Sequence, residues 1–400
     1  MDIDRLIAER AKRIDASGIR RVFDLGARLK DPINLSIGQP DFPVPDAVKA
    51  AAIRAIEGNQ NGYTQTQGIA PLRQRIVEHL RTDVGWEVDA RPLSAADPAR
   101  PGIIVTSGTS GALMLAFQAL LNPGDEAIIP DPYFAMYPHI CTMVGATGVP
   151  CNTYPDFRLT AARVEPLITA RTKLVLLNSP GNPAGVVATN NECRDLLELC
   201  RERNVLLISD EIYDTFTYAD AREPSPLGGG GAPTCPSPAR FPGAENDVLL
   251  IRGFGKTYGV TGWRLGYCAG PRRLIEEISK LQQYTYVCAP SPLQHGAAAC
   301  FDVDMSVQIE GYQKRRDMVI SRLSKVTEVA TPGGAFYAFV KVPSRLGLSA
   351  AQFTEKCLEK NLLVIPGNVF SKRDTHFRLS YATDFATLER GLSALEALMA

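Results

Sequence analysis

The amino-acid sequence predicts an α/β protein: a large domain with a mostly parallel seven-stranded sheet covered by helices, and a smaller α+β domain. A chain of 400 residues is long enough for two domains. From about residue 102, short runs that are apolar throughout alternate with helical patterns, as in parallel sheets buried on both faces. Beyond Pro271 helical patterns dominate, which indicates a second and different unit.

The large sheet is predicted from its apolar runs and from the helical patterns that separate them. The seven predicted strands are 103–106, 126–129, 147–150, 173–178, 205–209, 248–251 and 265–269. Helices are predicted between them near 110–121, 134–144, 160–169 and 190–203. In such sheets, ligands bind at the carboxyl ends of the strands.

Both ends of the chain are predicted to be mainly helical. The first thirty residues have an amphipathic helical pattern, and the proline-rich residues 34–45 are predicted to be extended. Asp46 is predicted to cap a helix that ends near Ile56, and another helix is predicted at 69–84. Towards the C-terminus, helices are predicted at 272–283, 293–301, 307–323 and 350–360, strands at 334–340, 363–366 and 377–381, and a last helix from Asp384. The proline- and glycine-rich segment 220–246 is predicted to be a mobile, solvent-exposed loop.

The composition excludes several classes of function. Basic and acidic residues are equal, at 43 each, so neither a nucleic-acid partner nor a membrane surface is expected. No apolar run is long enough to span a bilayer, and residues 1–5 lack the apolar core of a signal peptide. Nine scattered cysteines indicate reduced thiols in a cytoplasm, and four lone histidines make a metal site unexpected.

Lys256 stands where the strand predicted at 248–251 breaks into glycines. A lysine in such a place is expected to have a lowered amine pKa and to act as a nucleophile. A phosphate-binding P-loop is excluded because it requires glycine at position 250, which is Leu250. The dinucleotide fingerprint is excluded because its third glycine is replaced by Tyr258. On this stretch alone, a surface lysine in a glycine turn remains an equal alternative.

Other strand ends also carry polar groups. Gly108, Thr109 and Ser110 open a helix after the first strand, where they form either an anion site or an ordinary helix cap. Asp210 follows a strand that should be buried, and a buried aspartate is costly unless it is paired with a cation.

Taken in order, four motifs resemble those of the class I/II aminotransferases, fold type I enzymes that depend on pyridoxal 5'-phosphate. They are Asn-Pro-Ala-Gly at 182–185, Asp-Glu-Ile-Tyr at 210–213, the spacing of Lys256 and Arg264, and Phe-Arg-Leu-Ser at 377–380. The resemblance covers nearly the whole chain. It implies a ping-pong transfer of an amino group between an L-amino acid and a 2-oxo acid. It also implies a homodimer with active sites at the interface.

The resemblance further implies a domain division. Residues 1–45 would form an N-terminal arm and a segment of the small domain, 46–290 the large cofactor-binding domain, and 291–400 the small C-terminal domain.

The resemblance assigns the cofactor to residues of the large domain. Lys256 would form the resting Schiff base and then move a proton, and Asp210 would pair with the pyridine nitrogen. Asn182 and Tyr213 would hydrogen-bond the phenolic oxygen, and Phe134 would stack on the ring. The residues implied to hold the phosphate are Gly108, Thr109, Ser110, Arg264 and, from the neighbouring subunit, Tyr63.

The substrate is assigned to three residues. Arg378 would grip the α-carboxylate with two donors, and Gly38 and Asn182 would lie against the same group. The segment 280–290 is aromatic and uncharged, which favours neutral or aromatic amino acids.

The sequence departs from the family at two glycines. Family members carry a hydroxyl residue three positions before the lysine and often one directly before it, where this chain has Gly253 and Gly255. In the family, the first of these hydroxyls donates to the phosphate, so that contact is expected to be lost here unless neighbouring groups or water replace it. Two alternatives stay open: a carbon–sulfur β-lyase or related enzyme on the same fold, and a ligand-binding module without catalysis.

Overall fold

The apolar runs of the central region form the strands of one sheet in the computed structural model, which describes all residues except 17, 27–28 and 229–230. The strands are β2 (Gly102–Ser107), β3 (Glu126–Asp131), β4 (Thr147–Asn152), β5 (Thr172–Asn178), β6 (Leu206–Asp210), β7 (Val248–Gly253) and β8 (Leu265–Gly270). Their order is β2-β8-β7-β6-β5-β3-β4. Only β8 runs antiparallel to its neighbours, so the predicted mostly parallel, seven-stranded sheet is confirmed.

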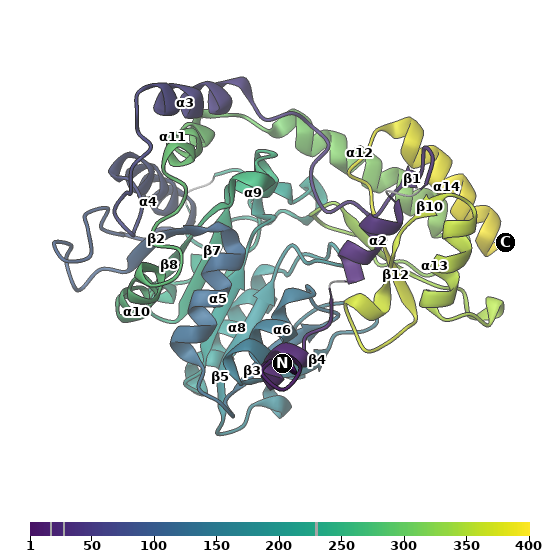
Figure 1. Cartoon of the computed structure of the whole chain (residues 1–400), viewed down its shortest axis with the longest axis horizontal. Helices are drawn as coiled ribbons and strands as arrows, with labels where there is room; N and C mark the ends of the chain where they lie inside the picture. Colours follow the sequence, from purple (N-terminus) through teal and green to yellow (C-terminus); the bar gives the residue numbers. More distant parts are fainter. Residues whose placement is uncertain (17, 27–28, 229–230) are drawn as a thin grey trace.

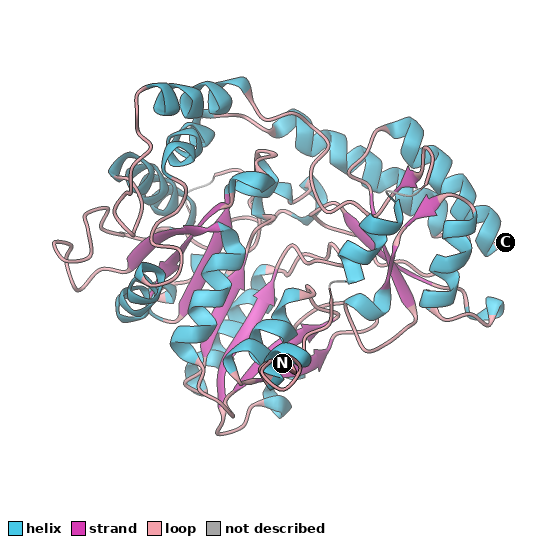
Figure 2. Cartoon of the chain, viewed as in Figure 1, coloured by secondary structure: helices cyan, strands magenta, loops and turns pink. Residues whose placement is uncertain are grey.

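Helices cover both faces of this sheet (Figure 2), and strands at its centre, such as β5 and β7, bury side chains on both sides. On β5, Leu174 and Leu176 pack in one core cluster while Val175 and Leu177 pack in the other. The first cluster includes α5 (Gly108–Leu120), α6 (Met136–Val144) and α10 (Arg272–Gln283). The second includes α3 (Asp46–Glu57), α4 (Ala70–Val84), α8 (Asn190–Glu202) and α11 (Ser291–Ala299).

A second set of elements lies beside the large sheet (Figure 1). Its antiparallel sheet has the order β11 (Ile365–Pro366), β12 (His376–Ser380), β9 (Tyr337–Lys341). The helices around it are α12 (Ser306–Leu323), α13 (Ala350–Glu359) and α14 (Phe385–Met399), and β1 (Ile33–Asn34) pairs with β10 (Leu362–Leu363). The division at residue 290 stays a prediction; α11, which follows it, contacts α3 and α4.

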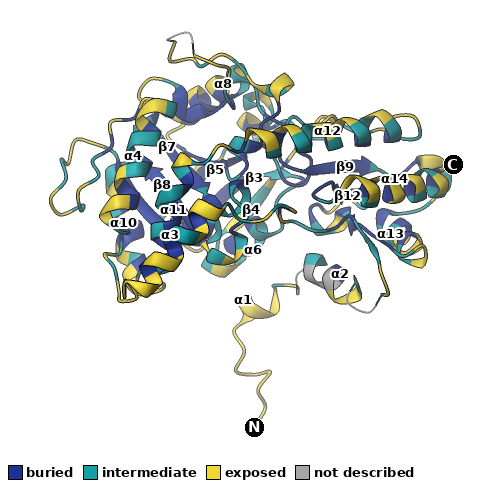
Figure 3. Cartoon of the chain, turned by 90° about the horizontal axis from the view of Figure 1, so that it is seen from above, coloured by how far each residue is buried: buried dark blue, intermediate teal, exposed yellow. Residues whose placement is uncertain are grey.

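Several predictions of local structure need correction. Among the described residues, the N-terminal helical pattern yields only α1 (Glu9–Lys12) and α2 (Gly18–Gly26), and residues 17 and 27–28 of that prediction lie outside the description. α1 and the exposed residues before it project from the body (Figure 3). Asp46 does not cap α3; it is the first helical residue after Pro45, and its carboxylate pairs with Lys49. The helix predicted at 160–169 shortens to α7 (Ala161–Val164) and a 3-10 turn.

The prediction of an exposed loop at 220–246 is wrong for residues 235–240, which are all buried. Ser237 donates a 2.5 Å hydrogen bond to Glu211, Trp86 donates to the carbonyl of Ala239, and Arg240 pairs with Asp83. The segment therefore returns to the body and packs against α4, α8 and β7, the strand that ends just before Lys256. Residues 229–230 of the prediction lie outside the description. No helix among the described residues is both long and apolar enough to cross a membrane.

Candidate active site

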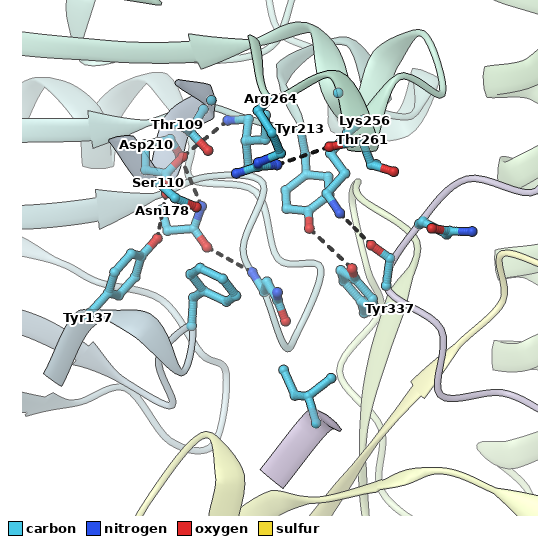
Figure 4. Close-up of a pocket in the computed structure, with 18 of the residues that line it drawn as sticks. Thr109, Ser110, Tyr137, Asn178, Asp210, Tyr213, Lys256, Thr261, Arg264 and Tyr337 are labelled. Carbon is cyan, nitrogen blue, oxygen red and sulfur yellow. Dashed lines mark hydrogen bonds between the residues drawn. The ribbon is translucent and has the colours of Figure 1, made fainter. Parts of the chain in front are cut away.

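A cavity of about 340 Å³ opens at the carboxyl ends of β5, β6 and β7, and β9 and β12 close its other side (Figure 4). With one exception, every residue that the sequence assigned to the site lines it. These residues are Gly38, Gly108, Thr109, Ser110, Phe134, Asn182, Asp210, Tyr213, Lys256, Arg264 and Arg378. They come from segments more than 300 residues apart in the chain, and elements of both sheets bring them to one cavity.

Lys256 lies on the short helix α9 (Phe254–Thr257), directly after β7. Its amine donates a hydrogen bond to the carbonyl of Gly38. Removal from water and the positive charges of Arg378 and Arg264 lower the pKa of Lys256 to about 8. About a tenth of the amine is therefore uncharged at pH 7, far more than for an ordinary lysine, and the uncharged amine is the nucleophile.

Asp210 is the last residue of β6 and is 3% exposed. Burial raises its pKa to about 6, although hydrogen bonds from the Tyr137 hydroxyl (2.7 Å) and the Ile212 amide favour the ionised form. Among the described residues, no basic side chain forms an ion pair with Asp210. The carboxylate therefore lacks a buried cation, which a ligand can supply.

Arg378 presents the opposite case, a buried cation without an anion. The flanking Phe377 and Leu379 point into the core of the second sheet, so the side chain of Arg378 points the other way, into the cavity. It is 1% exposed and donates to Asn182 Oδ1 at 3.0 Å and to the Ser36 carbonyl at 3.1 Å. Its Nε has no hydrogen-bond partner among the described residues, and burial lowers the pKa of Arg378. Such a guanidinium is suited to an anionic ligand.

The expected phosphate-binding residues meet at the first turn of α5. Gly108 has a φ of 68°, and a Cβ there would lie 2.9 Å from Nη2 of Arg264. A Cβ on Gly266 would lie 2.9 Å from the backbone nitrogen of Thr109. The two glycines thus let an arginine and a neighbouring strand approach the amide groups that begin the helix. Amide donors, the helix dipole and a guanidinium at one point favour a phosphate.

The two glycines that depart from the family differ in their surroundings. A Cβ on Gly253 would lie 2.8 Å from Ile212 Cδ1 and 3.0 Å from Thr109 Cγ2, so the space for a side chain is already filled. A Cβ on Gly255 would come no closer than 3.4 Å, to Thr261 Cα. A side chain at position 253 therefore requires the side-chain ends of Ile212 and Thr109 to shift, whereas one at position 255 requires no such shift.

Tyr63 is the one predicted site residue that does not line the cavity. It is 89% exposed, on a loop that Gln282 and Ser291 hold through hydrogen bonds to Thr66 and Gln60. The segment 280–290, which carries Gln282, also contributes no residue to the cavity. Within one chain, neither Tyr63 nor this segment can contact a ligand bound beside Lys256.

The structure adds residues that sequence reasoning missed. Asn178 ends β5, and its Oδ1 accepts from the amide of Asn182. Tyr137 lies one helical turn after Phe134, and a spacing of three residues could have indicated it. Tyr337 lines the cavity from β9, with its hydroxyl 3.2 Å from that of Tyr213. Alternation along the predicted strand 334–340 does not single out Tyr337, because its neighbours are apolar too.

The cavity is not lined by a cluster of metal-binding side chains in the part of the chain that the structure describes. Within the described part of the chain, no group of three or more His, Cys, Asp or Glu side chains could hold a metal ion.

Comparisons with known proteins agree with this geometry. A family model described as aminotransferase class I and II matches residues 30–395. The putative aminotransferase YugH of Bacillus subtilis (strain 168) is 34% identical over 396 residues, covering 96% of each chain. A probable N-acetyl-LL-diaminopimelate aminotransferase from the same strain is 35% identical, covering 98% of this chain and 96% of that protein. The solved structure of aspartate aminotransferase from Thermus thermophilus with maleate aligns with a TM-score of 0.87 at 30% identity, covering 98% and 99%.

Proposed function

The chain belongs to the class I and II aminotransferases, and we propose that it moves an amino group between an L-amino acid and a 2-oxo acid by a ping-pong route on pyridoxal phosphate. The observation that carries this proposal is one cavity with three complementary groups: the amine of Lys256, the unpaired carboxylate of Asp210 and the unpaired guanidinium of Arg378.

The residues present fit this cofactor. Asp210 lacks a cation, and a protonated pyridine nitrogen is one. The amides and guanidinium around Gly108 and Arg264 suit its phosphate, and the amine of Lys256 suits its aldehyde. When bound, pyridoxal phosphate supplies an electron sink that stabilises negative charge at the substrate Cα.

The side chains of this chain do the remaining work. Lys256 would hold the cofactor through its amine, and the freed Nζ would then move the proton at the substrate Cα. Asp210 would keep the pyridine nitrogen protonated. Asn182 and Tyr213 would donate hydrogen bonds to the phenolic oxygen, and Phe134 would cover the ring. Arg378 binds the substrate carboxylate, beside Gly38 and Asn182.

We propose a neutral or aromatic substrate side chain. Among the described residues that line the cavity, the cations are Lys256, Arg264 and Arg378, and each already has a proposed task. No lining cation remains in this chain for a second carboxylate. Preference for aspartate over every neutral donor, in a donor panel with saturating 2-oxoglutarate, would overturn this proposal.

We also propose a homodimer in which Tyr63 reaches the phosphate of the partner subunit. Its exposure and its distance from its own cavity support this arrangement. We further propose the domain division at residues 45 and 290, and a cytoplasmic location, which the nine free cysteines support.

Spectroscopy of the cofactor tests the proposed function. Protein loaded with pyridoxal phosphate is expected to show a visible absorption band that single amino acids convert and 2-oxo acids restore. Lys256→Ala should lose the band, whereas Lys280→Ala, a matched change at an exposed lysine, should keep it. Failure of every common amino acid to convert the band contradicts a transaminase. Release of pyruvate and ammonia without an acceptor oxo acid indicates a β-lyase instead.

A further inference from the structure

Tyr337 has no task in the proposed function, yet it contacts two residues that do, Tyr213 and Arg378. We propose that Tyr337 is a positioning residue that acts through two separate parts of its side chain: its hydroxyl orients Tyr213, and its ring holds Arg378. This inference rests on the proposed function, in which Tyr213 binds the cofactor and Arg378 binds the substrate carboxylate.

The first part is the contact between two hydroxyl groups. The phenol oxygens of Tyr213 and Tyr337 lie 3.2 Å apart, and their rings are nearly perpendicular, at 89° (Figure 4). Among the described residues, Tyr337 is the only hydrogen-bond partner of the Tyr213 hydroxyl. A phenol carries one proton. Tyr213 can therefore donate to a ligand and keep its hydrogen bond to Tyr337 only if Tyr337 is the donor in that bond. Two hydroxyls in series polarise each other, which makes Tyr213 a stronger donor.

The second part is the contact between the ring and a cation. The Arg378 guanidinium carbon lies 4.3 Å from the centroid of the Tyr337 ring and 4.8 Å from that of Phe370. Stacking on aromatic faces is stronger for a desolvated guanidinium than for an exposed one. It also fixes the plane of the guanidinium without using any of its N–H donors, so those donors remain available to a carboxylate.

The backbone holds Tyr337 in place for both contacts. β9 pairs with β12, with Tyr337 opposite Ser380 and Phe339 opposite Arg378. The side chain of Tyr337 is 1% exposed and also packs on Phe336. The other ionisable groups that line the same cavity are Asp210 on β6, Tyr137 on α6, Lys256 on α9 and Arg264 after it. None of these four forms a hydrogen bond with Tyr337.

Two substitutions separate the two contacts. Tyr337→Phe removes the hydroxyl and keeps the ring, whereas Tyr337→Leu removes both. Tyr218→Phe is a matched control, because Tyr218 is buried, donates to the carbonyl of Ala335 and has its hydroxyl 3.1 Å from that of Tyr381, but does not line the cavity. All variants are loaded with pyridoxal phosphate. Two quantities are measured: the pH midpoint of the visible band, and the Kd of 3-phenylpropionate, an unreactive monocarboxylate.

We expect Tyr337→Phe to raise the pH midpoint by about half a pH unit, because a weaker Tyr213 donor stabilises the phenolic oxyanion less. Its Kd for the carboxylate should stay within about twofold of wild type, whereas Tyr337→Leu should weaken binding about tenfold. Tyr218→Phe should change neither quantity. In the double variant with Tyr213→Phe, the hydroxyl of Tyr337 should have no further effect on the midpoint.

The inference is overturned by an unchanged midpoint in Tyr337→Phe, or by a shift that simply adds to that of Tyr213→Phe. It is also overturned if Tyr337→Phe and Tyr337→Leu weaken carboxylate binding equally. These results would leave the proposed function intact. A wild-type protein without a visible band that depends on Lys256 would overturn both. Melting temperatures of the cofactor-free variants show whether a loss arises from unfolding instead.

Discussion

The hydroxyl of Tyr137 donates a hydrogen bond to Oδ2 of Asp210 at 2.7 Å, and both side chains are buried. The bond favours the ionised carboxylate against the effect of burial, which dominates and raises the pKa of Asp210. The balance matters because Asp210 has to be charged to keep a pyridine nitrogen protonated.

The first prediction concerns this hydrogen bond. Tyr137→Phe should raise the pKa of Asp210 above its value of about 6, since the ionised form loses a donor. The affinity of the cofactor-free protein for pyridoxal phosphate, plotted against pH, should then fall off at a pH about half a unit higher. Equilibrium titrations with pyridoxal phosphate across the pH range check this. An equal move in Tyr218→Phe would assign the effect to general loosening of the fold.

The second prediction concerns the stability of the cofactor-free protein. The pKa of Asp210 is about 6 in the folded chain and 3.8 ordinarily, so between these values the folded state binds more protons than the unfolded state. Stability contributed by this group is therefore lost as pH rises through this window. Asp210→Asn should remove the loss and be more stable than wild type at neutral pH, by about 3 kcal/mol.

Urea unfolding of both proteins from about pH 4 to pH 8 measures this difference. Parallel curves of unfolding free energy against pH would contradict it. The same substitution should weaken cofactor binding, because it removes the proposed partner of the pyridine nitrogen. If Asp210→Asn is more stable than wild type without the cofactor but binds the cofactor more weakly, the carboxylate serves cofactor binding and does not stabilise the fold.

The third prediction concerns the buried guanidinium. Arg378→Lys keeps the positive charge but cannot donate two parallel hydrogen bonds to one carboxylate. We expect KM for the amino donor and for the 2-oxo acid to rise roughly a hundredfold. Arg373→Lys, at an exposed position nearby, is the control. Steady-state kinetics in both directions measure this, and a rise for only one of the two substrates would argue against a shared carboxylate site.

The fourth prediction concerns Tyr63 and uses mixed dimers. Tyr63→Phe and Lys256→Ala subunits are each expected to form defective dimers. If Tyr63 serves the partner's cavity, a hybrid of the two contains one site with both wild-type residues. Reassociation of an equal mixture should restore about a quarter of the wild-type sites. Activity at limiting cofactor measures the recovery. No recovery in a mixture shown to contain hybrids would place Tyr63 outside the partner's site.

The sequence predicted the residues whose chemistry is unusual for their position. Charged side chains are seldom buried, yet the sequence places three of them where burial is expected. They are Lys256 beside glycines, Asp210 after a buried strand and Arg378 between apolar residues, and all three line one cavity. It did not predict Tyr337 or Tyr137, because an aromatic residue in an apolar run is equally consistent with core packing. It also misjudged residues 235–240, because glycine and proline indicate a turning chain without showing where that chain packs.

The fifth prediction concerns the two glycines near Lys256. Gly253→Ser should destabilise the protein by about 1–3 kcal/mol, because its Cβ meets Ile212 and Thr109. Gly255→Ser, where the nearest atom is 3.4 Å away, should be nearly neutral. Adding Ile212→Val and Thr109→Ser, which remove the two obstructing methyl groups, should recover most of the loss. Thermal unfolding of the cofactor-free proteins compares them.

The packing around Gly253 also limits how this active site can change. Serine at position 253 restores the missing hydroxyl at a lower cost once its neighbours have become smaller, because the ends of Ile212 and Thr109 must otherwise shift. Either neighbour changed first leaves a gap of a single methyl group, which is a small loss of stability. The order of mutations therefore sets the stability of each intermediate between the two forms of this site.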